Sequence, residues 1–373
     1  MGTGTLVCRA FRRWRCGHNQ RSREPMAAST KTFFRGCWLR TRWGHRNRFV
    51  PKAVCLLAVF ALSCGSSTGI RSASSGARLV PLVHGDLTAS ALAINGADVF
   101  YNSTLGGRDE LRTVPKSGGV SRVVATSPGT PYAILADESF VYWTAGANPA
   151  TLNRIPLAGG PVETLFHAPL IVKGFAIDRE HAYVQESSLD AGTGTVWSVP
   201  LGGGPPVALA RGLSLSGGLV VDTQYVYAND VDRVVRIPQA GGPVEAVFHC
   251  ASVNCCFVAL ASDGQVLYAR DQDGTARAHS NTPDGSPAVL LGPALSNGND
   301  GLLDIFTASS VAYWNVRASV NGPDQTGQGV VRASADGTGF AYLTSSGQNV
   351  IGPRADGSDL FYFSDGTLFR QAQ

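Results

Sequence analysis

Two nearly identical stretches, "RIPLAGGPVETLFH" (Arg154–His167) and "RIPQAGGPVEAVFH" (Arg236–His249), lie 82 residues apart. Each contains a Gly-Gly pair, and such pairs supply the positive φ angles that tight hairpin turns require. Related turns occur at Pro115–Gly119, Pro156–Gly160, Pro200–Gly204 and Pro238–Gly242, and weaker forms end at Asp284-Gly285 and Asp336-Gly337. The chain is therefore a tandem array of similar hairpins.

A second marker, an aromatic segment such as "FVYWT" or "VAYWN", precedes each hairpin. Its tyrosines are Tyr101, Tyr142, Tyr183, Tyr227, Tyr268, Tyr313 and Tyr362, spaced 41, 41, 44, 41, 45 and 49 residues apart. Aromatic and β-branched segments of this length are typical of strands. With an inner strand before each marker and a hairpin after it, every period predicts four antiparallel strands, which is the pattern of a β-propeller blade.

The seven markers predict an all-β fold, a seven-bladed β-propeller. The chain ends at "TLFRQAQ", one strand short of a full seventh blade, while "RLVPLV" (Arg78–Val83) precedes the first blade. Pairing that strand with the last three closes the ring and removes two exposed sheet edges. We therefore expect a one-plus-three strand closure. A β-sandwich, two separate β domains, or a ring of six or eight blades are the alternatives.

The segments "FVYWT" and "AYWN" and the "RIPxAGGP" hairpins resemble the YWTD-like and NHL-like β-propellers, particularly those of uncharacterised bacterial secreted lipoproteins. The resemblance covers Arg78–Gln373 and implies the propeller fold. It implies no particular activity, because these residues belong to hairpins and blade packing, and propellers serve binding, scaffolding and catalysis alike.

Charge is divided unevenly along the chain. Residues 1–52 contain 13 Lys/Arg and one Asp/Glu, whereas the remainder contains 18 and 26, so the net charge of +4 hides a mildly acidic body. A nucleic-acid-binding surface needs basic residues clustered on the folded part, so we expect no nucleic-acid partner. The basic stretch is typical of a targeting segment.

A short apolar run, Ala53–Ser63, follows this basic stretch, and its eleven residues are too few to span a bilayer. The pattern is typical of a signal peptide. Ala61-Leu62-Ser63-Cys64 resembles the lipobox of bacterial lipoproteins, which implies a lipid on Cys64 and a membrane-anchored protein of the bacterial cell envelope, on the periplasmic side or in the outer membrane. The alternative is an ordinary secretory signal and a secreted protein.

These features divide the chain into four parts. Residues 1–49 are an N-terminal extension without a fold, residues 50–63 a lipoprotein-type signal peptide, residues 64–77 a Gly/Ser-rich tether and residues 78–373 the propeller. The extension is longer and richer in arginine than the basic part of a signal peptide, so we expect translation to start at Met26 or Val50.

In a four-stranded meander, the first and third connections of each blade lie on one face and the other connections lie on the opposite face. The former are short and uniform here, whereas the latter vary in length and are rich in Asp and Asn, as binding loops are. The candidate loop-face residues are Asp190, Asp230, Asp232, Asp271, Asp273, Asp300, Asp324 and Asp365. An acidic rim suits a cation, a sugar or a basic partner; alternatively, these residues serve only as turn formers.

No catalytic or metal site follows from the motifs. The stretch "DQDG" (Asp271–Gly274) resembles the start of a calcium loop, but the twelfth position holds Thr282 where a glutamate is needed. We therefore expect no cofactor, and calcium or magnesium has no motif in its support. Virginiamycin-inactivating lyases are also seven-bladed, yet none of their site residues can be matched to this sequence. His167 and His249 occupy equivalent repeat positions, which indicates a structural role.

The stretch "HCASVNCCF" contains the remaining cysteines of the mature chain, Cys250, Cys255 and Cys256. Outside the cytoplasm a close cysteine pair usually oxidises, so we expect a disulfide between Cys250 and either Cys255 or Cys256. A zinc site is the alternative, but no fourth ligand lies nearby.

Together these observations favour a monomeric lipoprotein whose propeller presents its variable face to a protein or a glycan. A lyase or hydrolase with its site at the mouth of the central channel is one alternative. A structural scaffold without a small-molecule ligand is the other.

Overall fold

The computed structural model describes residues 78–373 apart from short gaps, and within them all regular structure is β-strand. The gaps are residues 86–90, 105–106, 127–130, 132, 147–149, 189–192, 251–256, 272–274, 284, 293–303, 320–325 and 345–349. The predicted extension, signal peptide and tether (residues 1–49, 50–63 and 64–77) lie outside the described residues.

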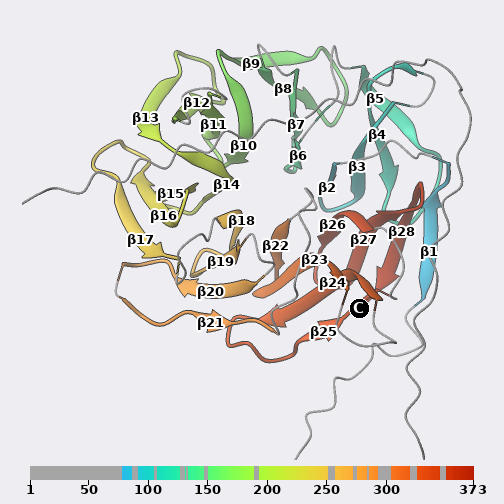
Figure 1. Ribbon diagram of the computed structural model, residues 1–373. Coiled ribbons are helices and arrows are strands. Elements are labelled where there is room, and N and C mark those ends of the chain that lie inside the picture. The colour runs from blue at the N-terminus through green and yellow to red at the C-terminus, as the bar shows by residue number, and fades with distance from the viewer. Residues whose placement is uncertain are drawn as a thin grey trace, which may run out of the picture. The chain divides into compact units, whose positions relative to one another are not determined.

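The strands form seven four-stranded antiparallel sheets arranged as the blades of a β-propeller (Figure 1). Blade 1 comprises β2 (Leu92–Ile94), β3 (Asp98–Ser103), β4 (Glu110–Pro115) and β5 (Arg122–Thr126), and blade 2 comprises β6 (Ala133–Ala136), β7 (Phe140–Ala145), β8 (Ala150–Pro156) and β9 (Glu163–Ala168). Blade 3 comprises β10 (Ile171–Ile177), β11 (His181–Ser187), β12 (Gly194–Pro200) and β13 (Val207–Leu213).

Blade 4 comprises β14 (Leu215–Val221), β15 (Tyr225–Asp230), β16 (Arg233–Pro238) and β17 (Glu245–His249), and blade 5 comprises β18 (Phe257–Ser262), β19 (Val266–Asp271), β20 (Ala276–Ser280) and β21 (Val289–Leu290). Blade 6 comprises β22 (Ile305–Ala308), β23 (Val311–Ser319), β24 (Thr326–Ser334) and β25 (Ala341–Tyr342). Blade 7 comprises β26 (Val350–Ala355), β27 (Asp359–Ser364), β28 (Thr367–Ala372) and the N-terminal strand β1 (Leu79–Val83).

The predicted one-plus-three closure is confirmed. Strand β1 pairs antiparallel with β28, with Leu79 opposite Gln371 and Val80 opposite Arg370. Figure 1 shows this N-terminal strand in blue beside the red C-terminal strands. The seventh sheet is thus built from both ends of the folded part, so the ring closes without an unpaired third strand.

The core lies between the blades. The described residues form seven hydrophobic clusters, and each joins two neighbouring blades. In the cluster between blades 1 and 2, for example, Phe100 packs with Trp143, which is fully buried. Because a blade buries its faces only against its neighbours, similar blades must follow one another in tandem.

The four connections of a blade divide between two faces. We name the four strands of a blade A to D, from the inner strand to the outer strand. The first connection is then the A–B turn and the third is the C–D turn, and we refer to the face that they share as the turn face. A backbone hydrogen bond joins them within a blade: the amide of Leu157 donates to the carbonyl of Ser139 at 2.8 Å, and that of Leu201 to Glu180 at 2.8 Å. The B–C and D–A connections lie on the opposite face, the loop face.

In blades 2 to 5 the A–B turn begins with an aspartate whose two oxygens have different partners. In blade 3, Asp178 Oδ1 accepts from the amides of Glu180 and His181 at 2.8 and 2.7 Å, and Oδ2 accepts from the Tyr183 hydroxyl at 2.8 Å. The same arrangement, which we call the Asp–Tyr pair, recurs as Asp137 with Tyr142, Asp222 with Tyr227 and Asp263 with Tyr268.

The Asp–Tyr pair holds the tyrosine in its neutral form. Burial, together with the hydrogen bond to Asp137, raises the pKa of Tyr142 to about 12. Burial and the carboxylate likewise raise the pKa of Tyr183. A neutral phenol donates to the carboxylate, so these turns are held by a charge-assisted hydrogen bond throughout the physiological range.

Blades 1 and 7 depart from the repeat. The residues that pack against the next blade, as Tyr183 does, are Phe100 and Phe361, and the marker tyrosines Tyr101 and Tyr362 follow them by one residue. Because side chains alternate along a strand, Tyr101 packs against blade 7. In blades 1 and 7 the predicted marker tyrosines therefore lie one residue after the residue that packs against the next blade.

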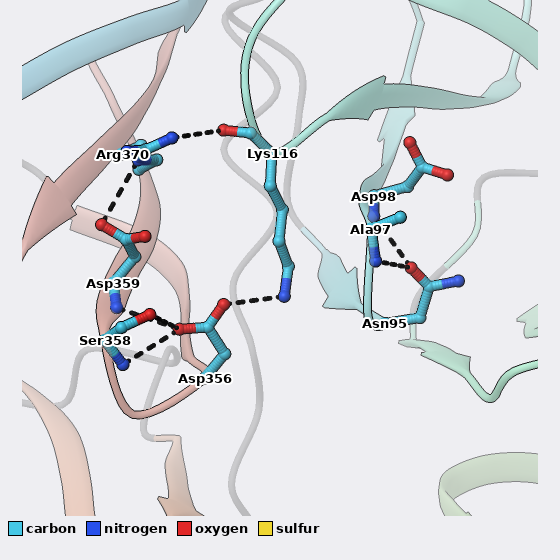
Figure 2. Close-up of polar contacts among 8 residues, drawn as sticks. All are labelled: Asn95, Ala97, Asp98, Lys116, Asp356, Ser358, Asp359 and Arg370. Atoms are coloured by element: carbon cyan, nitrogen blue, oxygen red, sulfur yellow. Dashed lines mark hydrogen bonds and ion pairs between the residues drawn. The ribbon is translucent and has the colours of Figure 1, made fainter.

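In blade 7 a lysine from the neighbouring blade takes the place of the missing phenol. Lys116 Nζ, in the C–D turn of blade 1, donates to Asp356 Oδ2 at 2.8 Å (Figure 2). The same ammonium group lies over the Phe361 ring. Its carbonyl accepts from Arg370 Nη1 at 3.1 Å. These contacts join blade 1 to blade 7 where the ring closes.

Replacement of Tyr183 by phenylalanine is expected to lower the free energy of unfolding by about 1.5–3 kcal/mol, because it removes a hydrogen bond to a carboxylate and leaves that oxygen without its partner. Chemical denaturation followed by far-ultraviolet circular dichroism measures the change. Tyr225→Phe is the control, since the Tyr225 ring packs on Arg236 and its hydroxyl has no hydrogen bond within the described part of the chain. Equal losses in both variants would contradict the role of the pair.

Replacement of Lys116 by methionine is expected to cost about 1–2 kcal/mol at neutral pH. Burial raises the pKa of the Asp356 carboxyl. The hydrogen bonds from Lys116 and the turn amides outweigh this effect and lower the pKa to about 2. This stabilisation is fully present above the unfolded-state pKa of about 3.9 and is lost as the pH falls from there towards 2. Denaturation at pH 7, 4 and 2.5 should show the variants converging in acid, with Lys173→Met as an exposed-lysine control. A difference at pH 2.5 as large as that at pH 7 would rule out the ion pair as its source.

Candidate functional site

The loop face carries the length variation of the fold, as predicted. The A–B turns contain three residues in six blades and two in blade 6. The C–D turns contain six residues in blades 1 to 4 and 6 and eight in blade 5, while in blade 7 the third and fourth strands come from opposite ends of the folded part. The B–C connections range from two to six residues and the D–A connections from one to fourteen. A rigid frame with variable loops on one side is the usual arrangement of a binding surface.

Beneath this face the second strand of six blades carries a polar residue two positions after the residue that packs against the next blade. These residues are Asn102, Thr144, Gln185, Asn229, Arg270 and Asn315. Asn102 Oδ1 accepts from the Ala91 amide at 2.7 Å, just before the inner strand of its blade. Asn315 Oδ1 accepts both from the Asp304 amide and from Arg270 Nη1, each at 3.0 Å. Their role there is to hold the entry of the inner strand.

Gln185 and Asn229 differ from Asn102, because their side-chain amides are fully buried and have no hydrogen-bond partner within the described residues. In both blades the pairing of the inner strand shifts register, between Val172 and Gly174 and between Leu215 and Leu219. Gly218 lies close to Asn229, and a Cβ built there would stand 2.5 Å from Nδ2.

The predicted acidic rim divides into engaged and exposed residues. Asp230 accepts from the Ser214 amide at 2.7 Å and from Arg233 Nη2 at 2.6 Å, and Asp271 forms an ion pair with Arg277. Asp232 and Asp365 are exposed, and Asp365 has a positive φ of 48°, as turn residues have. Asp190, Asp273, Asp300 and Asp324 lie outside the described residues. Two of the four described aspartates are thus held by arginines, and the other two are exposed to solvent.

No group of three or more potential metal ligands occurs among the residues that the structure describes. In the same residues there is no helix with the length and apolar character needed to cross a membrane. Cys250 is disulfide-bonded, and it is the one cysteine in the described part of the chain. The choice between Cys255 and Cys256 as its partner therefore stays a prediction.

A cavity of about 400 Å³ lies between the outer strand β17 of blade 4 and, in blade 5, the third strand β20 with the connection that follows it. Phe248 and His279 line it and stack with their ring centroids 3.5 Å apart. Burial, with a further contribution from Arg277, lowers the pKa of His279 to about 4, so the imidazole is neutral at physiological pH. Sequence reasoning missed this cavity, because blade 5 departs here from the regular Gly-Gly hairpin and its outer strand β21 has two residues.

Comparison with known proteins supports the fold. No protein-family model matches the chain, and no curated relative matches it. Virginiamycin B lyase from Staphylococcus aureus superimposes with a TM-score of 0.60 at 9% identity, over 80% of this chain and 99% of the lyase. Oligogalacturonate lyase in complex with manganese gives 0.57 at 12% identity, over 81% and 98%.

The propeller of the Trilobed protease from Pyrococcus furiosus, described as having an open velcro topology, gives a TM-score of 0.52 at 12% identity, over 76% of this chain and 94% of that one. At these identities the likeness shows the β-propeller fold and nothing of the chemistry. No site residue is carried over from any of these proteins.

Replacing Asn102 by leucine is expected to cost about 1–3 kcal/mol of unfolding free energy, because it leaves the buried Ala91 amide without an acceptor. The same change at Asn229 should be close to neutral, since its amide has no partner within the described residues. Urea denaturation of both variants makes the comparison. A loss at Asn229 as large as at Asn102 would mean that the Asn229 amide binds a group of its own.

Proposed function

We propose that the chain is a bacterial cell-envelope lipoprotein, anchored by a lipid on Cys64, whose propeller binds a protein or a glycan through its loop face. The observation that carries the proposal is the contrast between the two faces. On the turn face, A–B turns of nearly constant length are closed by internal contacts such as the Asp–Tyr pairs. On the loop face, connections of one to fourteen residues leave the same frame.

The chemistry of the described loop-face residues fits recognition of a polar partner. Asp232 and Asp365 are exposed there, and Val231 adds an apolar side chain that is 42% exposed. Non-obligate binding surfaces are about as apolar as the rest of a protein surface, so this mixed composition is compatible with a polar partner.

Lipid attachment is tested in a bacterial host by metabolic labelling with an alkyne analogue of palmitate. The wild-type chain is expected to incorporate the label and to sediment with membranes. Cys64→Ala should lose both properties, because no thiol remains for acylation. Secretion of an unlabelled wild-type chain would show that Cys64 belongs to an ordinary secretory signal and would refute the anchor.

Binding through the loop face is tested by a photoactivated crosslinking residue placed in the full chain in cells. Placed at Val231 or Asp365, the crosslinker is expected to give one discrete adduct of a protein or a glycan. Arg179 is the matched control, since it is exposed on the turn face. If position 179 gives an adduct and the two loop-face positions give none, the binding surface lies on the turn face and the proposal is overturned.

A further inference from the structure

The exposed large apolar side chains of the described residues are concentrated in one kind of place. Eight of the nine lie in an outer strand or within two residues before one. They are Leu79, Val120, Val123, Val162, Val207, Val244, Val289 and Leu290. The ninth, Val231, lies on the loop face. Single exposed valines are common on protein surfaces, but here the same place is used in six of the seven blades.

The hairpin repeat fixes where these side chains lie. In blades 2 and 4, Gly-Gly-Pro is followed by Val162 and Val244, which are 44% and 38% exposed, and in blade 3 the doubled proline is followed by Val207, which is 55% exposed. Each of these valines stands at the end of a C–D turn, so the set runs around the outer rim of the turn face. We refer to it as the apolar rim.

The N-terminal strand enters the propeller at the same rim. Leu79, the first residue of β1, is opposite Gln371 and is 42% exposed. Gln373 lies two residues after Gln371, and its amide donates to the carbonyl of Ser358 in the A–B turn of blade 7 at 3.0 Å. Any segment that precedes Arg78 is therefore joined to the propeller at the edge of the turn face.

We propose that the apolar rim rests on the surface of the lipid bilayer that holds the anchor, so that the loop face points away from the membrane. The inference rests on the lipidation of Cys64 in the proposed function. Residues 64–77 span at most about 50 Å when fully extended, so the anchor keeps the rim within reach of the bilayer and raises its effective concentration there.

The spacing of the rim favours a bilayer over a protein as its occupant. A protein interface needs a continuous apolar centre, whereas the rim presents one or two apolar side chains on each of six blades. A bilayer interface accepts such side chains separately, and the affinity grows with the apolar area that enters it. The A–B turns of this face carry Asp137, Asp178, Asp222 and Asp263. These carboxylates do not attract anionic lipid, so the contact is tested on zwitterionic vesicles.

The test uses the full chain, processed and lipidated in a bacterial host and then reconstituted into phosphatidylcholine vesicles with or without bromine on the acyl chains. Tryptophan replaces Val162 in one variant and Val231 in its matched control, two valines of similar exposure on opposite faces. Bromine quenches tryptophan within the bilayer, and the native tryptophans contribute equally to every variant. Val162→Trp is expected to lose fluorescence in brominated vesicles, while Val231→Trp keeps the wild-type ratio.

Equal quenching of both variants, or quenching of Val231→Trp alone, would overturn the orientation while leaving the lipid anchor in place. A mature chain whose mass shows no lipid on Cys64 would overturn the anchor and this orientation together. Self-association of the wild type that is abolished by Val162→Asp with Val207→Asp would show that the rim binds a second copy instead of lipid.

Discussion

The ring depends on the hydrogen bonds of the aspartate with which the A–B turn begins in blades 2 to 5. One oxygen of Asp178 accepts two turn amides and the other accepts the Tyr183 hydroxyl, so one side chain sets both the turn and the position of the second strand. The Tyr183 ring belongs to the cluster that packs against blade 4, so the same contact also sets how neighbouring blades meet. A carboxylate is tolerated in this partly buried place because its hydrogen bonds are made.

This constraint explains why the two faces differ. An insertion in an A–B turn would separate the carboxylate from its amides, and the turns keep three residues in six blades. The B–C and D–A connections take no part in the pair, so their length is free to vary. Blade 6 shows that the pair can be replaced: Ala308 occupies the aspartate position, and Tyr313 donates instead to Gln373 Oε1, next to β28 of blade 7, at 2.8 Å.

Most of the fold could be predicted from the sequence, because hairpin turns and alternating strands are local patterns that recur in every blade. The closure followed from counting, since Arg78–Val83 had no blade before it and the last blade lacked a strand. The packing of Phe100 and Phe361 against the next blade could not be predicted, because in each case the following tyrosine fits the aromatic strand pattern equally well. The contact of Lys116 with Asp356 joins residues 240 positions apart, so no local pattern predicts it. Asp230 and Asp271 were predicted as loop-face residues, but their ion pairs with arginines could not be predicted from a turn pattern. The recurrence of aspartate five residues before four of the tyrosines was a readable signal.

The central claim is that the turn face is a rigid frame and the loop face is the variable surface that it carries. Native-state hydrogen exchange of the full chain measures this directly, amide by amide. The amides of Glu180, His181 and Tyr225, which are bonded to aspartates of the turns, are expected to exchange only through global unfolding. The Val231 amide on the loop face should exchange through local opening of lower free energy. Turn-face amides that open as readily as Val231 would contradict the account.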